Sequence, residues 1–155
     1  NHLNEQYNGR KPDIIDNAFV IVNFENGIRS MLDLCMFSEN SKLQEELCAV
    51  GNIGKIETGV PSFLSGKSSS ELSIGLRKSN NIQIENIEVD ETILKAGHHH
   101  GSTYYEHLEF QKAITENLSA QVSLDDGLKA VAIGQAAELS IIEKRVVYIN
   151  EILED

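Results

Sequence analysis

The stretch that decides the fold runs from Ala18 to Phe37 and reads AFVIVNFENGIRSMLDLCMF. Residues 18–24 are rich in β-branched and aromatic side chains, which favour an extended strand. The pair Asn26-Gly27 follows, and both residue types tolerate the positive φ that a two-residue hairpin turn requires. We therefore predict a β-hairpin whose second strand returns over residues 28–37.

Four further strands are predicted from runs of apolar, β-branched or alternating residues, and they cover 43–50, 55–58, 71–77 and 82–89. Pro61, Gly66 and several serines predict a loop over residues 59–70. In the strand over 82–89 the apolar residues change parity, so we expect a bulge near Glu85-Asn86.

In the last third of the chain the spacing of apolar residues becomes helical. Thr103 followed by Glu106 is a capping-box pattern, which predicts the start of a first helix. A second helix is predicted to begin at Ser123, with carboxylates in its first turn, and to end near residue 143. A short strand is predicted over residues 146–149.

Strands that come first and are linked by hairpins, with helices after them, predict an α+β fold. We expect a large, mostly antiparallel open β-sheet with helices packed on one face. The 155 residues suit one domain of ordinary size, so residues 1–155 are predicted to form a single domain.

Composition limits the possible partners. The chain is 41% hydrophobic and 24% charged, which is typical of a folded globular protein. Its formal net charge of −11 would repel a phosphate backbone, so we expect neither nucleic acid nor a membrane as a partner. No apolar run approaches the roughly 20 residues that a membrane-spanning helix needs. We expect a cytoplasmic protein.

The two cysteines, Cys35 and Cys48, fall in neighbouring predicted strands. A disulfide between them stays open as an interpretation, but buried, reduced thiols are favoured in a domain with a core of this size. Two cysteines without a Cys-x-x-Cys pair do not suffice for a metal site built on thiolates.

The glycines at 51 and 54 do not form a phosphate-binding loop. Gly51-Asn52-Ile53-Gly54-Lys55 has neither the spacing of a P-loop nor that of the Gly-x-Gly-x-x-Gly turn of a dinucleotide-binding domain. We therefore expect no cofactor-binding residues in this chain.

Four segments resemble one known family in their order and spacing. The first has an acidic lead-in, an apolar strand, Phe24, a polar pair and Gly27; the second is a strand followed by a Gly-x-x-Gly turn. The segments cover residues 13–27, 45–57, 99–108 and 122–127. Together they resemble the C-terminal domain of the glucose–fructose oxidoreductase / inositol dehydrogenase (Gfo/Idh/MocA) family.

The resemblance implies a parent enzyme of two domains. An N-terminal Rossmann domain, absent from this chain, would bind NAD or NADP, and hydride would pass between the nicotinamide and a carbinol carbon of a sugar, polyol or related compound. The catalytic residues of the family would then lie upstream, so none is assigned here. The resemblance also implies a homodimer or homotetramer assembled through the open sheet face.

The run His98-His99-His100 is the most unusual local feature. Imidazoles at a helix N-terminus can hydrogen-bond to substrate hydroxyls, and the resemblance places this segment in the substrate cleft. The candidate substrate-binding residues that it and the following turn supply are His98, His100, Ser102, Tyr104 and Tyr105.

Two other interpretations of the histidine run stay open: a solvated loop and a metal site. Adjacent residues of an extended segment point to alternate sides, so only His98 and His100 could share a face. His107 lies on the apolar side of the predicted helix and is expected to be a core histidine.

The hairpin carries apolar residues on both faces. Phe19 and Ile21 lie on the face opposite the main apolar row, as do Met31, Cys35 and Phe37 on the returning strand. An exposed apolar face of this kind usually marks an interface. The chain is expected to self-associate through the sheet face that its helices do not cover.

Two other functions remain open. One is a non-catalytic assembly or sensing module that keeps the same sheet, and the other is a metal-dependent enzyme built on the histidine cluster.

Overall fold

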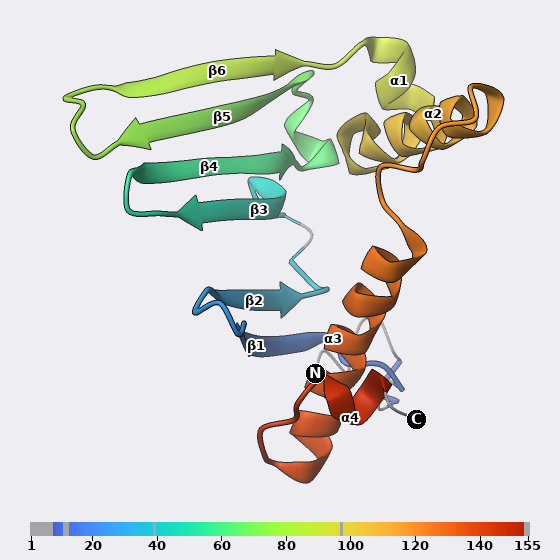
Figure 1. Ribbon diagram of the computed structural model, residues 1–155. Helices are drawn as coiled ribbons and strands as arrows, with labels where there is room; N and C mark the ends of the chain where they lie inside the picture. Colours follow the sequence, from blue (N-terminus) through green and yellow to red (C-terminus); the bar gives the residue numbers. More distant parts are fainter. Residues whose placement is uncertain (1–7, 11–12, 39, 97, 154–155) are drawn as a thin grey trace. The chain divides into compact units, whose positions relative to one another are not determined.

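The computed structural model describes residues 8–10, 13–38, 40–96 and 98–153 (Figure 1). The chain divides into two compact units, one formed by Asn1–Ser38 with Gln121–Asp155 and the other by Glu39–Ala120. Each unit combines antiparallel strands with helices, which confirms the predicted α+β class. The organisation of residues 1–155 as a single domain stays a prediction.

The first unit contains the hairpin of β1 (Asn17–Asn23) and β2 (Arg29–Cys35). Its loop differs from the prediction. The N–H of Phe24 donates to the carbonyl of Ile28 at 2.9 Å, and the N–H of Gly27 donates to the carbonyl of Phe24 at 2.9 Å. These bonds close a loop of residues 25–27, in which only Gly27 has a positive φ, +83°. The hairpin is therefore confirmed, but its turn is the longer type that ends in a left-handed glycine.

The long helix α3 (Leu124–Glu143) confirms the predicted second helix. The Ser123 hydroxyl accepts the N–H of Asp126 at 3.1 Å, and the Asp126 carboxylate accepts the N–H of Ser123 at 3.0 Å. Hydrogen bonds from the side chain and backbone of Ser123 lower the pKa of the Asp126 carboxyl. Ala132 and Ala136 are buried, and these small residues let neighbouring segments approach the helix closely.

The predicted strand over residues 146–149 is wrong. The chain turns there into the short helix α4 (Asn150–Leu153), which contacts α3. Arg145 donates to the carboxylates of Glu143 and Glu151, and the N–H of Tyr148 donates to Glu151 at 2.7 Å. These partners raise the pKa of Arg145 and lower that of Glu151. In a strand, the N–H of Tyr148 would bind a neighbouring strand. Here the side chain of Glu151 already binds it.

The second unit is built on a four-stranded antiparallel sheet in the order β3-β4-β5-β6. Its strands are β3 (Leu43–Val50), β4 (Gly54–Pro61), β5 (Ser69–Leu76) and β6 (Ile82–Glu88). The bulge expected near Glu85 is wrong, because the β5–β6 register is constant from Ser69↔Glu88 to Gly75↔Ile82. The irregularity lies instead between β3 and β4, where the register shifts between Leu43 and Glu45.

Helices and 3-10 turns make up the rest of this unit. The predicted loop over 59–70 contains the end of β4 and the 3-10 turn η1 (Phe63–Ser65). Helix α1 (Glu91–Ala96), which the sequence analysis did not predict, follows β6. The Asp90 carboxylate accepts the backbone N–H of Thr92 at 2.8 Å as well as its hydroxyl, and these bonds lower the pKa of Asp90. The 3-10 turn η2 (His99–Gly101) and helix α2 (Ser102–Thr115) complete the unit.

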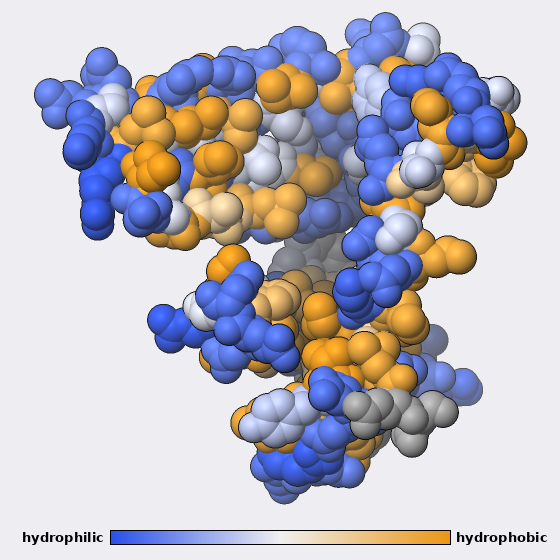
Figure 2. Space-filling model, viewed as in Figure 1, coloured by the Kyte–Doolittle hydropathy of each residue, from blue (hydrophilic) through white to orange (hydrophobic). Residues whose placement is uncertain are grey.

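Many apolar side chains remain at the surface, and Figure 2 shows them over the four-stranded sheet. Cys35 and Cys48 are both free thiols, and both are exposed, so the expectation of buried cysteines is wrong. Each lies on a strand face that carries little covering structure. No helix in the described ranges is long and apolar enough to cross a membrane.

The capping box predicts the effect of one substitution. Replacing Ser123→Ala removes the acceptor for the Asp126 N–H at the start of α3, so the free energy of unfolding should fall by about 1 kcal/mol. Urea unfolding followed by circular dichroism measures this loss. Ser119→Ala, at an exposed position before the helix, is the control and should change the free energy of unfolding by less than about 0.5 kcal/mol. Equal effects of the two substitutions would contradict the role of the cap.

Candidate functional site

The segment that carries the candidate residues has an unusual backbone. His98 is extended, with φ −88° and ψ 179°, whereas His99, His100 and Gly101 have φ values of +54°, +55° and +87°. Three successive left-handed residues form a tight turn that leads directly into α2. The assumption of an extended run, in which His98 and His100 share a face, is therefore wrong. Residues other than glycine store strain in this conformation, and such strain is concentrated at functional sites.

Gly101 makes this turn possible. It is buried, and a Cβ atom on it would lie 2.8 Å from Cγ2 of Ile93 and 3.1 Å from Cγ1 of Val89. The backbone at the start of α2 thus lies directly against apolar side chains of α1 and of the residue after β6. Both the positive φ and the close approach require a residue without a side chain.

His99 connects the turn to the sheet. Its Nε2 lies 3.6 Å from Oε1 of Glu45 on β3, and its Nδ1 lies 3.3 Å from the hydroxyl of Thr103 on α2. The imidazole thus lies between a carboxylate of the sheet and a hydroxyl of α2. The contact of Glu45 could not be predicted, since no local sequence pattern connects a residue of β3 with a turn so far along the chain.

His100 differs from its neighbour. The side chain is half-buried, and its Nε2 atom is buried without a hydrogen-bond partner among the described residues. A buried polar atom without a partner costs free energy comparable to a lost hydrogen bond, so such atoms are rare in folded proteins. Among the described residues, the Nε2 atom of His100 is thus an exception to this rule.

The other candidate residues surround this turn. The Ser102 hydroxyl donates to the His99 carbonyl at 2.8 Å, which closes the turn. The rings of Tyr104 and Tyr105 meet edge to face with their centroids 6.4 Å apart, and the residues are 38% and 44% exposed. The rings of His98 and His99 also meet edge to face. The turn thus presents imidazole and phenol groups at an accessible surface.

The structure also corrects one assignment. His107 is exposed on α2, so the expectation of a core histidine is wrong. The apolar residues around it are exposed too, with Leu108 at 40% and Phe110 at 59%, because the described part of this unit places little against that side of α2.

Among the residues with described positions, no group of three or more His, Cys, Asp or Glu side chains converges to hold a metal ion. Within the described ranges, the pair His99 and Glu45 has no third such residue beside it.

Comparison with known proteins bears on this arrangement. Residues 1–149 match the family model that is described as the C-terminal alpha/beta domain of the Gfo/Idh/MocA oxidoreductase family. The chain belongs to this family. Among curated proteins, none matches the chain. The matched residues include the η2 turn and all the candidate residues. Because the family model is that of the C-terminal domain, the chain is the C-terminal part of a Gfo/Idh/MocA oxidoreductase.

The Gfo/Idh/MocA domain should be sensitive to a methyl group at Gly101. Gly101→Ala should lower the melting temperature by several degrees, because the new Cβ meets Ile93 and Val89 and the positive φ disfavours alanine. Differential scanning calorimetry measures the change. Gly134→Ala is the matched control, since this helical glycine has open space around its Cβ position and alanine favours a helix. A melting temperature unchanged in Gly101→Ala would contradict the close packing of the turn.

Proposed function

We propose that this chain is the substrate-binding and oligomerisation domain of an NAD(P)-dependent oxidoreductase that acts on a sugar, polyol or related carbinol. The observation that carries the proposal is the Nε2 of His100, which has no partner among the described residues and lies in a strained turn of an oxidoreductase-family domain.

A hydroxyl group suits the His100 nitrogen in either tautomer, because a hydroxyl both donates and accepts a hydrogen bond. Tyr104 and Tyr105 follow within the first turn of α2 and are accessible from solvent. Phenol and imidazole groups together offer several hydrogen bonds to neighbouring hydroxyls of one ligand. A polyhydroxylated substrate uses such a set better than an anion or an apolar molecule.

The cofactor belongs to another part of the enzyme. This chain lacks the glycine-rich turn that binds a pyrophosphate, so NAD or NADP would be bound by an upstream Rossmann domain. The role proposed for the residues of α2 and η2 is to bind and orient the carbinol, while the cofactor accepts or donates hydride. No residue of this chain is assigned a proton-transfer role.

Measurement of kcat/KM for the full-length oxidoreductase that contains this chain tests the proposal. With a panel of sugars and polyols, His100→Ala should lower kcat/KM about tenfold on the best substrate, which corresponds to about 1.4 kcal/mol of lost transition-state binding. Tyr104→Phe should lower it in the same direction. The KM for NAD or NADP should not change, because neither residue is proposed to contact the cofactor.

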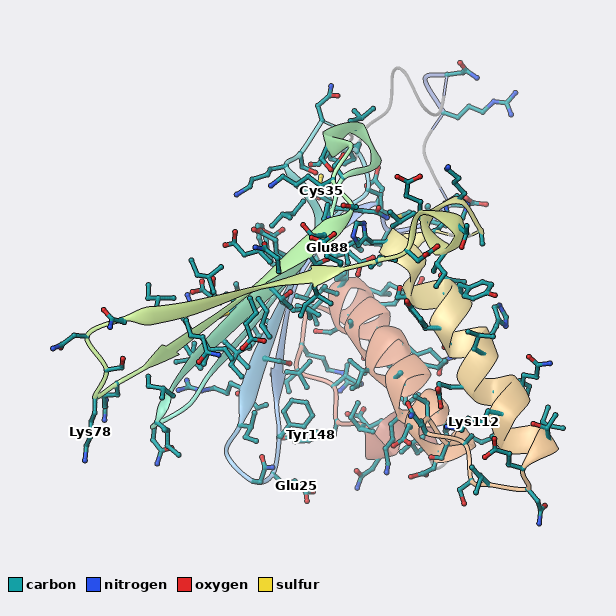
Figure 3. The ribbon with its side chains drawn as sticks, turned by 90° about the horizontal axis from the view of Figure 1, so that it is seen from above. Glu25, Cys35, Lys78, Glu88, Lys112 and Tyr148 are labelled. Atoms are coloured by element: carbon teal, nitrogen blue, oxygen red, sulfur yellow. The ribbon has the colours of Figure 1, made fainter. Side chains whose placement is uncertain are left out.

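Lys112→Ala is the control for these kinetics, since Lys112 lies in the last turn of the same helix (Figure 3). It should leave kcat/KM unchanged. If the full-length protein oxidises no sugar or polyol with either cofactor, the non-catalytic assembly module becomes the better interpretation.

The proposed oligomerisation rests on the exposed face of the β1–β2 hairpin. Phe19, Ile21 and Met31 are 78%, 71% and 70% exposed, and Ile21 pairs directly with Met31 across the two strands. Alternate residues of β1 are half-buried, so the exposed side of this strand is the one that carries Phe19 and Ile21. Phe37 lies beyond the end of β2 and is half-buried, and it is therefore not part of this exposed row.

Sedimentation equilibrium tests this interface. The 155-residue chain should sediment at micromolar concentration with at least twice its mass of 17.2 kDa. The double substitution Phe19→Lys and Met31→Lys should give a monomer with unchanged circular dichroism, because both side chains are largely exposed. Asn52→Lys with Asn80→Lys adds the same charge at exposed turns and should leave the association intact. A wild-type chain that remains monomeric would contradict the interface.

A further inference from the structure

The loop that closes the β1–β2 hairpin carries the residue pair Asn26-Gly27 at its tip. All three residues of this loop, 25–27, are exposed, and Figure 3 labels Glu25 at the end of the hairpin. A Cβ atom on Gly27 would have no atom within 4 Å, so open space surrounds the backbone at this point. In the described part of the chain, the pair is therefore not shielded by neighbouring side chains.

An asparagine that is followed by glycine can react with its own backbone. The backbone nitrogen of the following residue attacks the side-chain carbon Cγ, and a side chain on that residue would obstruct the approach. Glycine has no side chain and reaches the widest range of φ and ψ. The chain contains two such pairs. Asn8-Gly9 borders residues outside the described ranges, whereas Asn26-Gly27 and its neighbours lie within them.

A hydrogen bond folds the Asn26 side chain back over Gly27. The backbone N–H of Ile28 donates to Oδ1 of Asn26 at 3.0 Å, which holds the side-chain amide on the side of the Gly27 backbone. An N–H in this position also stabilises negative charge that develops on Oδ1 during an attack on Cγ. The loop thus keeps the amide of Asn26 close to the nitrogen with which it would react.

A single backbone hydrogen bond restrains the reacting nitrogen. The N–H of Gly27 donates to the carbonyl of Phe24 at 2.9 Å, and this bond must open before the nitrogen can lose its proton and turn toward Cγ. Opening costs least at an exposed loop tip with few apolar contacts. The hydrogen bond from the N–H of Phe24 to the carbonyl of Ile28 closes the strands below the loop and can stay in place. Local opening of the tip is therefore sufficient.

We propose that Asn26 is a site of spontaneous covalent modification that converts the β1–β2 loop into aspartyl and isoaspartyl forms. The Gly27 nitrogen loses its proton and forms a bond to Cγ of Asn26. The bond from Cγ to Nδ2 breaks, and the amide nitrogen leaves as ammonia with that proton. Water then opens the resulting five-membered imide at either of its two carbonyl carbons. The reaction needs no oxidant or cofactor, and the proposal does not rest on the proposed function.

Both products change the hairpin. Each adds a negative charge beside Glu25, in a chain whose formal net charge is already −11. The isoaspartyl form also routes the main chain through the former side chain, which lengthens the loop between Phe24 and Ile28 by one carbon atom. These two residues share the hydrogen bond that closes the strands. We therefore expect the end of the hairpin to loosen as the protein ages.

Peptide mapping by mass spectrometry tests the proposal on the 155-residue chain, incubated at mildly alkaline pH. The peptide that contains Asn26 should gain close to one dalton, separate into two chromatographic forms, and take up oxygen from water labelled with oxygen-18. The rate should lie within about tenfold of that in the urea-unfolded chain, because opening of the loop tip costs little.

Two other asparagines serve as controls in the same digest. Asn52 and Asn81 are exposed residues in the turns of the four-stranded sheet, but isoleucine follows each of them. Both should stay unmodified over the same period. The variant Asn26→Gln keeps an amide at this position, but its reaction would require a six-membered ring. It should therefore not be modified, and its circular dichroism should match that of the wild type.

Three results would overturn the proposal. An Asn26 peptide that stays unchanged in the folded chain, while the unfolded chain is modified, would mean that the loop prevents the attack. Equal modification of Asn52 and Asn26 would mean that Gly27 does not determine the site. A rate that falls as the protein concentration rises would mean that a second copy covers the loop. The exposed row proposed as an interface lies on β1 and β2 and not in this loop.

Discussion

The second unit depends on one steric constraint, the space that Gly101 leaves open. Val89 and Ile93 occupy the volume that a side chain at this position would take, so the backbone at the start of α2 lies directly against them. The positive φ of Gly101 then reverses the chain, directly after the left-handed His99 and His100. The orientation of His99 toward Glu45 and the burial of the His100 nitrogen both follow from this packing.

The sequence predicted those parts of the fold whose signals are local. The β1–β2 hairpin follows from β-branched residues and a glycine turn, the strand at 43–50 from its apolar pattern, and α3 from Ser123 and Asp126. The errors arose where a contact that no residue pattern reveals decided the local structure. The strand expected at 146–149 is replaced by a turn because Glu151 binds both Arg145 and the N–H of Tyr148. The side-chain cap predicted at Thr103 is also wrong. Helix α2 begins at Ser102 with Gly101 as its N-cap, and no side chain caps it.

The candidate site shows the same division. Residue type, together with the family resemblance, identified the histidine run and the tyrosines as a group with binding chemistry, and the structure places them around one turn. The left-handed conformation of His99 and His100 could not be predicted, because it results from packing around Gly101 and not from a propensity of histidine. Glu45 was missed because its link to His99 exists only once β3 and η2 are adjacent in space.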